Sequence, residues 1–179
     1  MANVPPTRLS NYDPRVQAYL MRDWAQSLAP EGITDFLTIS LMKQQSGTDP
    51  ERWNTRTSPQ RQDLNRDIIR RIDRVVYGRN HMKKPQYYKY EFFMLEETRD
   101  RSGNSVFAHV HAGLALLNHE RKVFIDKWPK IQWSIEKLVE NRGLYPDVSR
   151  QDADDGVVKY IVKNALTEAQ TILTRATMY

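Results

Sequence analysis

Two histidines separated by one residue, His109 and His111, form the clearest chemical pattern in the sequence. They lie in a segment, 106–117, whose composition predicts a β-strand. Residues two apart in a strand face the same side, so both imidazoles can reach one cation while Val110 faces the other side. Manganese, zinc and similar metals accept histidine ligands readily. An isolated His-x-His pair is common on solvated strands, so the metal interpretation needs support from elsewhere in the chain.

A carboxylate on the preceding strand gives that support. Glu96 and Glu97 end an aromatic segment, 86–97, that predicts a strand, and a polar turn over 98–104 joins it to the histidine strand as a hairpin. Adjacent strand residues point in opposite directions, so only one of the two glutamates can join the histidines. We favour Glu97 as the third ligand and keep Glu96 as the alternative. Both could instead be solvated residues near the turn.

A third pattern is Tyr160-Ile161-Val162-Lys163, within a helix predicted to begin at Asp154 or Asp155. Positions i and i+3 share a helix face, so Tyr160 and Lys163 are neighbours. A lysine ammonium favours the phenolate form of a tyrosine and can offset charge on a phosphate, so the pair suits nucleophilic attack. The alternative is an amphipathic helix in which Tyr160 is half-buried and Lys163 is solvated.

In chain order, these patterns resemble the motifs of the HUH endonuclease superfamily, particularly single-tyrosine rolling-circle replication initiators. The matching segments are Phe36-Leu37-Thr38-Ile39-Ser40, His109-Val110-His111 and Tyr160-Ile161-Val162-Lys163. The resemblance covers residues 33–166. The first motif is a loose match, and the segment between Glu97 and His109 is longer than is usual in the family.

The resemblance implies metal-dependent nicking and joining of single-stranded DNA, specific for a sequence or a hairpin. Mg²⁺ or Mn²⁺ would be held by the two histidines and a glutamate, and Tyr160 would form a covalent 5′-phosphotyrosine with Lys163 assisting. Asn164 stands one helical turn after Tyr160, which indicates a single-tyrosine enzyme. No Gly-x-x-x-x-Gly-Lys-Ser/Thr phosphate loop is present. Either the chain is a nuclease domain separated from its helicase domain, or it is a small initiator with a host helicase as its partner.

A basic and aromatic stretch in the middle of the sequence is the expected DNA-binding surface. Single strands are held by cations that neutralise phosphates and by rings on which bases stack. The cations of this stretch are Arg66, Arg70, Arg71, Arg74, Arg79, Lys83 and Lys84. We assign DNA binding to Arg70, Arg74, Arg79, Lys83, Lys84, Tyr87 and Tyr88, and also to Thr38 in the first motif. Three acids among the helix arginines, Asp63, Asp67 and Asp73, allow the alternative of a solvated, ion-paired face.

The order of predicted elements indicates an α+β fold around a mainly antiparallel sheet flanked by helices. The resemblance implies that this sheet is RRM-like or ferredoxin-like. We predict helices over 13–28, 58–77, 126–141 and from 154 or 155 to about 166, strands over 33–43, 86–97, 106–117 and 145–150, and a loop over 44–57. Trp133 is expected to face inward. We predict an N-terminal helical extension over 1–32 and one endonuclease domain over 33–179.

Composition narrows the classes of protein. The 179 residues suit one domain with a real core, and the absence of cysteine excludes disulfides and thiolate metal sites. A formal net charge of +5 favours polyanionic partners. No apolar run is long enough for a membrane span, and no secretory signal is evident. We expect a cytoplasmic monomer without a membrane partner, or a nuclear protein if the source is a eukaryotic virus.

Three other functions fit parts of the pattern. A non-catalytic, RRM-like binder of single-stranded nucleic acid would use the tyrosines for stacking and would not need the histidines to converge. A metal-dependent phosphodiesterase would need the metal but not Tyr160. A mobilisation or transposition nuclease would use the same chemistry as a replication initiator.

Overall fold

A computed structural model describes residues 32–42, 48–83, 85, 89–100, 102–153 and 173–174. Their strands form one antiparallel sheet in the order β4-β1-β3-β2-β5. The strands are β1 (Asp35–Ser40), β2 (Glu91–Arg99), β3 (Ser105–Ala115), β4 (Asp147–Asp152) and β5 (Leu173–Thr174). The helices are α2 (Pro50–Arg61), α3 (Leu64–Tyr77), α4 (Asn118–Asp126) and α5 (Trp128–Glu140), with a short 3-10 turn, η2 (His81–Lys83). The α+β prediction is confirmed.

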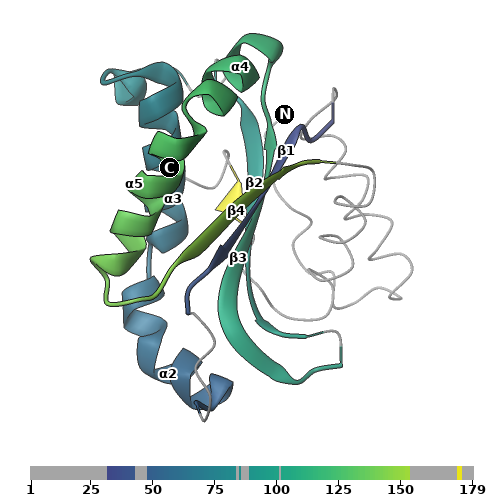
Figure 1. Cartoon of the computed structure of the whole chain (residues 1–179), viewed down its shortest axis with the longest axis vertical. Coiled ribbons are helices and arrows are strands. Elements are labelled where there is room, and N and C mark those ends of the chain that lie inside the picture. Colours follow the sequence, from purple (N-terminus) through teal and green to yellow (C-terminus); the bar gives the residue numbers. More distant parts are fainter. Residues whose placement is uncertain are drawn as a thin grey trace.

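The first four strands are connected as a ferredoxin-like unit. Helices α2 and α3 join β1 to β2, a hairpin joins β2 to β3, and α4 and α5 join β3 to β4. With β3 between β1 and β2, and β4 beside β1, this is the β-α-β-β-α-β arrangement. Figure 1 shows α3 and α5 side by side along one face of this sheet.

The two faces of the sheet carry different residues because side chains alternate along each strand. The helix-covered face is apolar: Leu37, Val110 and Leu114 are fully buried in the core that the sheet shares with α3 and α5. The opposite face carries His109 and His111 on the central strand β3. The sheet therefore separates the main core from the histidine face.

Helix α2 was missed by the sequence prediction, which placed a loop over 44–57 and one helix over 58–77. Asp49 caps α2, since its carboxylate accepts from the amide of Glu51 at 3.0 Å, and Pro50 occupies the first turn. Pro59, near the predicted helix start at residue 58, lies inside α2. The chain breaks at Asp63, which has a positive φ of 59°, and α3 follows.

The helix expected over 126–141 is present as α5, but the helix before it was missed and the orientation of Trp133 was wrong. The missed helix is α4, whose Glu120 carboxylate accepts from the amide of Leu117 at 2.9 Å. This cap stabilises a short helix whose apolar residues show little helical periodicity in the sequence. On α5, Trp133 faces solvent and is 60% exposed, because Ile131, Ile135 and Val139 form the buried stripe instead.

The strands follow the predictions with shifted ends. Strand β2 begins at Glu91 rather than at residue 86, and the preceding Tyr90 is buried and stacked near Tyr77. Strand β4 is the predicted edge strand, displaced by two residues. At the start of β1, buried Asp35 accepts from Arg121 at 3.0 Å and from Arg150 at 2.7 Å, which ties α4 and β4 to the first strand.

Several predicted features lie outside the described residues. These are the helices over 13–28 and 154–166, and the site residues Lys84, Tyr87, Tyr88, Tyr160 and Lys163. None of the helices in the described ranges has the length and apolar character needed to cross a membrane.

Candidate metal centre

The register of the β2-β3 hairpin brings the predicted metal ligands together. Glu97 lies directly opposite His109, and Leu95 lies opposite His111. Directly opposed residues of antiparallel strands project from the same face, so the Glu97 carboxylate and both imidazoles share one surface. The alternation along β2 assigns this place to Glu97 and not to Glu96.

One carboxylate oxygen lies close to both imidazoles. Oε2 of Glu97 is 3.2 Å from Nε2 of His109 and 3.3 Å from Nε2 of His111. The ligand atoms of the three side chains lie within 4.8 Å of one another. Glu97 and His111 are buried, whereas the side chain of His109 is 22% exposed. The cluster could hold a metal ion, with His109 on its more exposed side.

These distances suit a small cation. With ligand–metal distances of about 2.1 Å, adjacent ligands are about 3.0 Å apart in octahedral and about 3.4 Å apart in tetrahedral coordination. The two carboxylate–imidazole distances fall in that range.

Both imidazoles are held through their other ring nitrogen. Nδ1 of His109 lies 3.0 Å from the carbonyl oxygen of Phe107, which can only accept a hydrogen bond. The proton of a neutral His109 ring therefore resides on Nδ1, and the lone pair on Nε2 points toward the cluster. Nδ1 of His111 lies 3.3 Å from the Thr38 hydroxyl. The Phe107 carbonyl fixes both the tautomer and the orientation of the His109 ring, whereas the Thr38 hydroxyl, which can donate or accept, orients the His111 ring.

The environment of His111 keeps its ring uncharged. Burial lowers the pKa of His111 to about 4, and the nearby His109 lowers it in the same direction. The ring of Phe36 stacks on that of His111 with centroids 5.3 Å apart. A neutral imidazole is the form that binds metals, so His111 needs no deprotonation at neutral pH to act as a ligand.

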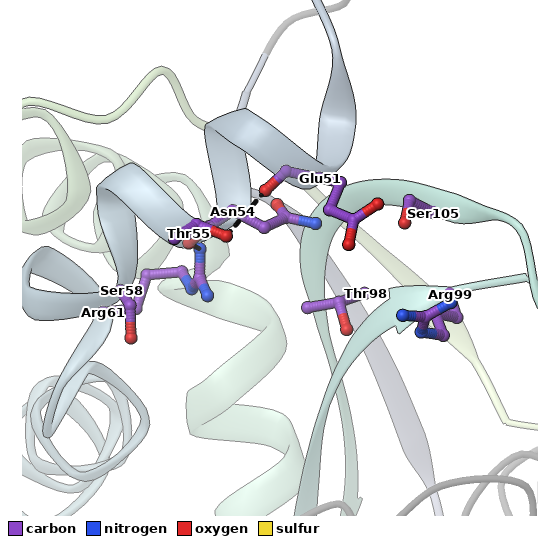
Figure 2. Close-up of a pocket in the computed structure, with 8 residues that line it drawn as sticks. All are labelled: Glu51, Asn54, Thr55, Ser58, Arg61, Thr98, Arg99 and Ser105. Atoms are coloured by element: carbon purple, nitrogen blue, oxygen red, sulfur yellow. Dashed lines mark hydrogen bonds between the residues drawn. The ribbon is translucent and has the colours of Figure 1, made fainter.

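Glu96 points to the opposite face of the sheet. Its carboxylate accepts from Nε of Arg61 at 3.0 Å, and the Arg61 side chain is only 8% exposed. Figure 2 shows Arg61 at a polar pocket between α2 and the hairpin, where it also donates to the carbonyl of Asn54. Glu96 therefore anchors α2 to the sheet and is not one of the clustered ligands.

Thr38, one of the predicted DNA-binding residues, lies beside the cluster. It is opposite His111 across the β1-β3 pair, which explains the contact between its hydroxyl and Nδ1 of His111. The sequence motif did not indicate this role, because it depends on the register between two strands far apart in the chain. The stacking of Phe36 on His111 escaped prediction for the same reason.

The predicted DNA-binding arginines divide into two groups. Arg70 pairs with Asp67 at 3.1 Å, as the neighbouring Arg66 does with Asp63 at 3.0 Å. Both arginines are therefore ion-paired, and DNA binding by Arg70 stays a prediction. Arg74 and Arg79 are exposed and line a basic pocket with residues of α5. The side chain of Lys83 is also exposed.

Comparisons with protein-family models, with curated proteins and with solved structures gave no match.

Proposed function

We propose that this protein nicks and rejoins single-stranded DNA through a covalent 5′-phosphotyrosine on Tyr160, with a divalent metal held by Glu97, His109 and His111. The observation that carries the proposal is the convergence of one carboxylate oxygen on two Nε2 atoms, at 3.2 Å and 3.3 Å. Together with Tyr160-Ile161-Val162-Lys163, this arrangement resembles a single-tyrosine HUH endonuclease that initiates rolling-circle replication.

The chemistry is a reversible exchange of phosphodiester bonds. A bound Mg²⁺ or Mn²⁺ would polarise the scissile phosphate. The phenolic oxygen of Tyr160 attacks phosphorus, a new P–O bond forms to the tyrosine, and the bond to the 3′ oxygen breaks. The proton that the phenol loses is balanced by the proton that the departing 3′ oxygen gains as it becomes a 3′-hydroxyl. Lys163 favours the phenolate that attacks. A later 3′-hydroxyl attacks the phosphotyrosine and restores the strand, so no ATP is consumed.

The donor set bears on which metal is used. Two imidazoles and one carboxylate suit manganese and other borderline metals better than magnesium, which prefers oxygen ligands. We therefore expect Mn²⁺ to support the reaction at a lower concentration than Mg²⁺. A mobilisation or transposition nuclease would use the same residues, and so would share this metal preference.

A non-catalytic binder on the same type of sheet is supported less well. Such binders stack bases on exposed rings of the sheet surface. On the histidine face, Phe36 and Phe93 are only 6% and 2% exposed, so neither ring offers a platform. The convergence of Glu97, His109 and His111, which such a binder does not need, favours the metal-dependent nuclease.

The partners that belong to the proposed function are an origin strand or hairpin and a host helicase. We propose that they act together in the cytoplasm, or in the nucleus of a virus host.

The test is metal-dependent cleavage of single-stranded oligonucleotides, including a set of origin hairpins. We expect cleavage with Mn²⁺, none with EDTA, and none in His111→Ala. The matched control is His119→Ala, since His119 is an exposed histidine on α4 outside the cluster. Cleavage that persists in EDTA or in His111→Ala would remove the metal cluster from the mechanism.

A further inference from the structure

A basic pocket of about 470 Å³ lies between α3 and α5, in the layer of helices on the far side of the sheet from the metal cluster. Its cations and its aromatic residue are Arg71, Arg74, Arg79, Lys127, Lys130 and Trp133. The two helices lie side by side in Figure 1. The proposed nuclease chemistry makes no use of this pocket.

Helical spacing explains how the two helices build the pocket. Arg71 and Arg74 on α3 are three residues apart, so they share a face. Lys130 and Trp133 on α5 are also three residues apart. The buried stripes of both helices point toward the sheet, which leaves these four side chains on the outer surface.

The charge of the pocket is not neutralised by the described part of the chain. No carboxylate is among the lining residues. None of the five cations makes an ion pair with a described residue, whereas Arg66 and Arg70 on the same helix pair with Asp63 and Asp67. Five positive charges around one pocket repel one another. A polyanion that enters the pocket relieves this repulsion, so it gains more electrostatic binding free energy there than from isolated surface cations.

Trp133 adds a flat aromatic surface to the pocket, which binding of a simple anion would not require. Its side chain is 60% exposed at a place lined otherwise mostly by cations. An exposed tryptophan beside arginines and lysines combines a flat stacking surface with phosphate-binding groups. The same combination holds bases and phosphates of single strands in proteins that bind them without sequence preference.

We propose that this pocket binds a segment of single-stranded nucleic acid, with a base stacked on Trp133 and phosphates held by the five cations. Its volume is in the range of small-ligand sites, which accommodates a nucleotide unit rather than a folded partner. The choice of DNA as the bound nucleic acid rests on the proposed function. The pocket holds a part of the strand remote from the nicking site, because the sheet and the helix layer separate the two.

The test is binding of a fluorescently labelled single-stranded oligonucleotide in EDTA, which removes the metal contribution. We expect Trp133→Ala to weaken binding about fivefold or more, and Trp133→Phe to retain part of it. The double variant Arg71→Ala/Arg74→Ala should reduce the slope of log K against log salt by about 1.4. Arg66→Ala is the matched control and should change the slope much less, because Asp63 already neutralises Arg66. All of these positions are exposed, and thermal unfolding checks that each variant folds.

Competitors identify the ligand chemistry. A mononucleotide should compete weakly, and inorganic polyphosphate should compete equally well with wild type and Trp133→Ala. If polyphosphate, an acidic peptide or anionic vesicles displace the oligonucleotide and Trp133→Ala binds it normally, the pocket is not a nucleic-acid site. If the protein nicks DNA and all pocket variants bind the oligonucleotide normally, the pocket proposal is wrong and the proposed function stands. If the pocket variants lose binding as predicted but the protein never nicks DNA, the proposed function is wrong and the pocket proposal stands.

Discussion

Glu97 lies directly opposite His109 across the β2-β3 hairpin, and Oε2 of Glu97 is 3.2 Å from Nε2 of His109. The same oxygen is 3.3 Å from Nε2 of His111. A buried carboxylate between two imidazoles is stabilised by a proton or a cation shared among them. Because burial lowers the pKa of His111 to about 4, a metal ion suits the site better than a proton on that ring at neutral pH.

Neighbouring glutamates should therefore respond differently to the same substitution. Glu97→Gln keeps the size of the side chain but removes its charge. Substitution of a residue that only contacts a metal ligand lowers metal affinity about 10–100-fold, and we expect the loss of Mn²⁺ affinity in Glu97→Gln to be at least as large. Glu96→Gln should leave Mn²⁺ binding intact and cost about 1–3 kcal/mol of stability, since it weakens the contact with the largely buried Arg61. Calorimetric titration with Mn²⁺ and urea unfolding measure the two effects. Equal Mn²⁺ affinities in the two variants would exclude Glu97 as a ligand.

Thr38 should act through His111 without binding the metal itself. Thr38→Val removes the hydroxyl 3.3 Å from Nδ1 of His111, and we expect Mn²⁺ affinity to fall about 10–100-fold. Thr38→Ser keeps the hydroxyl and should restore most of the affinity. If valine and serine at this position bind Mn²⁺ equally, the hydroxyl does not orient His111.

The stability of the metal-free protein should fall in mild acid. The pKa of His111 is about 4 in the folded state against an ordinary 6.5, so between these values the unfolded chain binds a proton that the native state does not. The free energy of unfolding is then highest above pH 6.5 and falls as the pH drops toward 4, by about 3 kcal/mol at most from this residue. Urea unfolding across this range in EDTA measures the slope. His111→Gln should flatten the slope, and an unchanged slope would show that His111 is not the cause.

Gly113 should tolerate no side chain. A Cβ built on Gly113 lies 2.3 Å from Cζ of Phe93, whose ring crosses the glycine from the opposite strand. Gly113→Ala forces the buried ring to move, which we expect to cost about 1–3 kcal/mol. Gly143→Ala is a comparison without steric contact, although its φ of 74° adds backbone strain. Phe93→Leu replaces the ring with a smaller side chain, so the double variant Gly113→Ala/Phe93→Leu should recover part of the stability that Gly113→Ala loses, as measured by the midpoint of thermal unfolding. No recovery would mean that the contact with the ring is not the cause.

Prediction from sequence succeeded where local pattern decides the structure. The alternation along β2 and β3 and the polar turn between them are enough to form a hairpin, so spacing predicted that one of the two glutamates shares a face with His109 and His111. The choice of Glu97 over Glu96 needed the register of the two strands. The contact of Thr38 with His111 did not follow, because it depends on how β1 pairs with β3. Register between distant strands is set by packing that a local pattern does not encode.

The helices show the corresponding failures. The sequence predicted one helix that begins at residue 58, but the Asp49-Pro50 cap begins α2 earlier and Pro59 is accommodated inside it. Trp133 was expected in the core because large aromatic residues are usually buried, whereas the apolar stripe of α5 is formed by isoleucines and valine. This exposed tryptophan, which the sequence did not predict, is the residue on which the proposed strand-binding pocket depends.

Covalent capture of DNA tests the central proposal most directly. The protein is incubated with Mn²⁺ and a single-stranded origin oligonucleotide labelled on the 3′ side of the nick, and the products are separated on a denaturing gel. We predict a shifted protein–DNA band with wild type and with Tyr145→Phe, a control at an exposed tyrosine, and no band with Tyr160→Phe, which should still bind the strand. The absence of any shifted band with wild type across a set of origin hairpins, or nicking that survives Tyr160→Phe, would contradict the tyrosine mechanism.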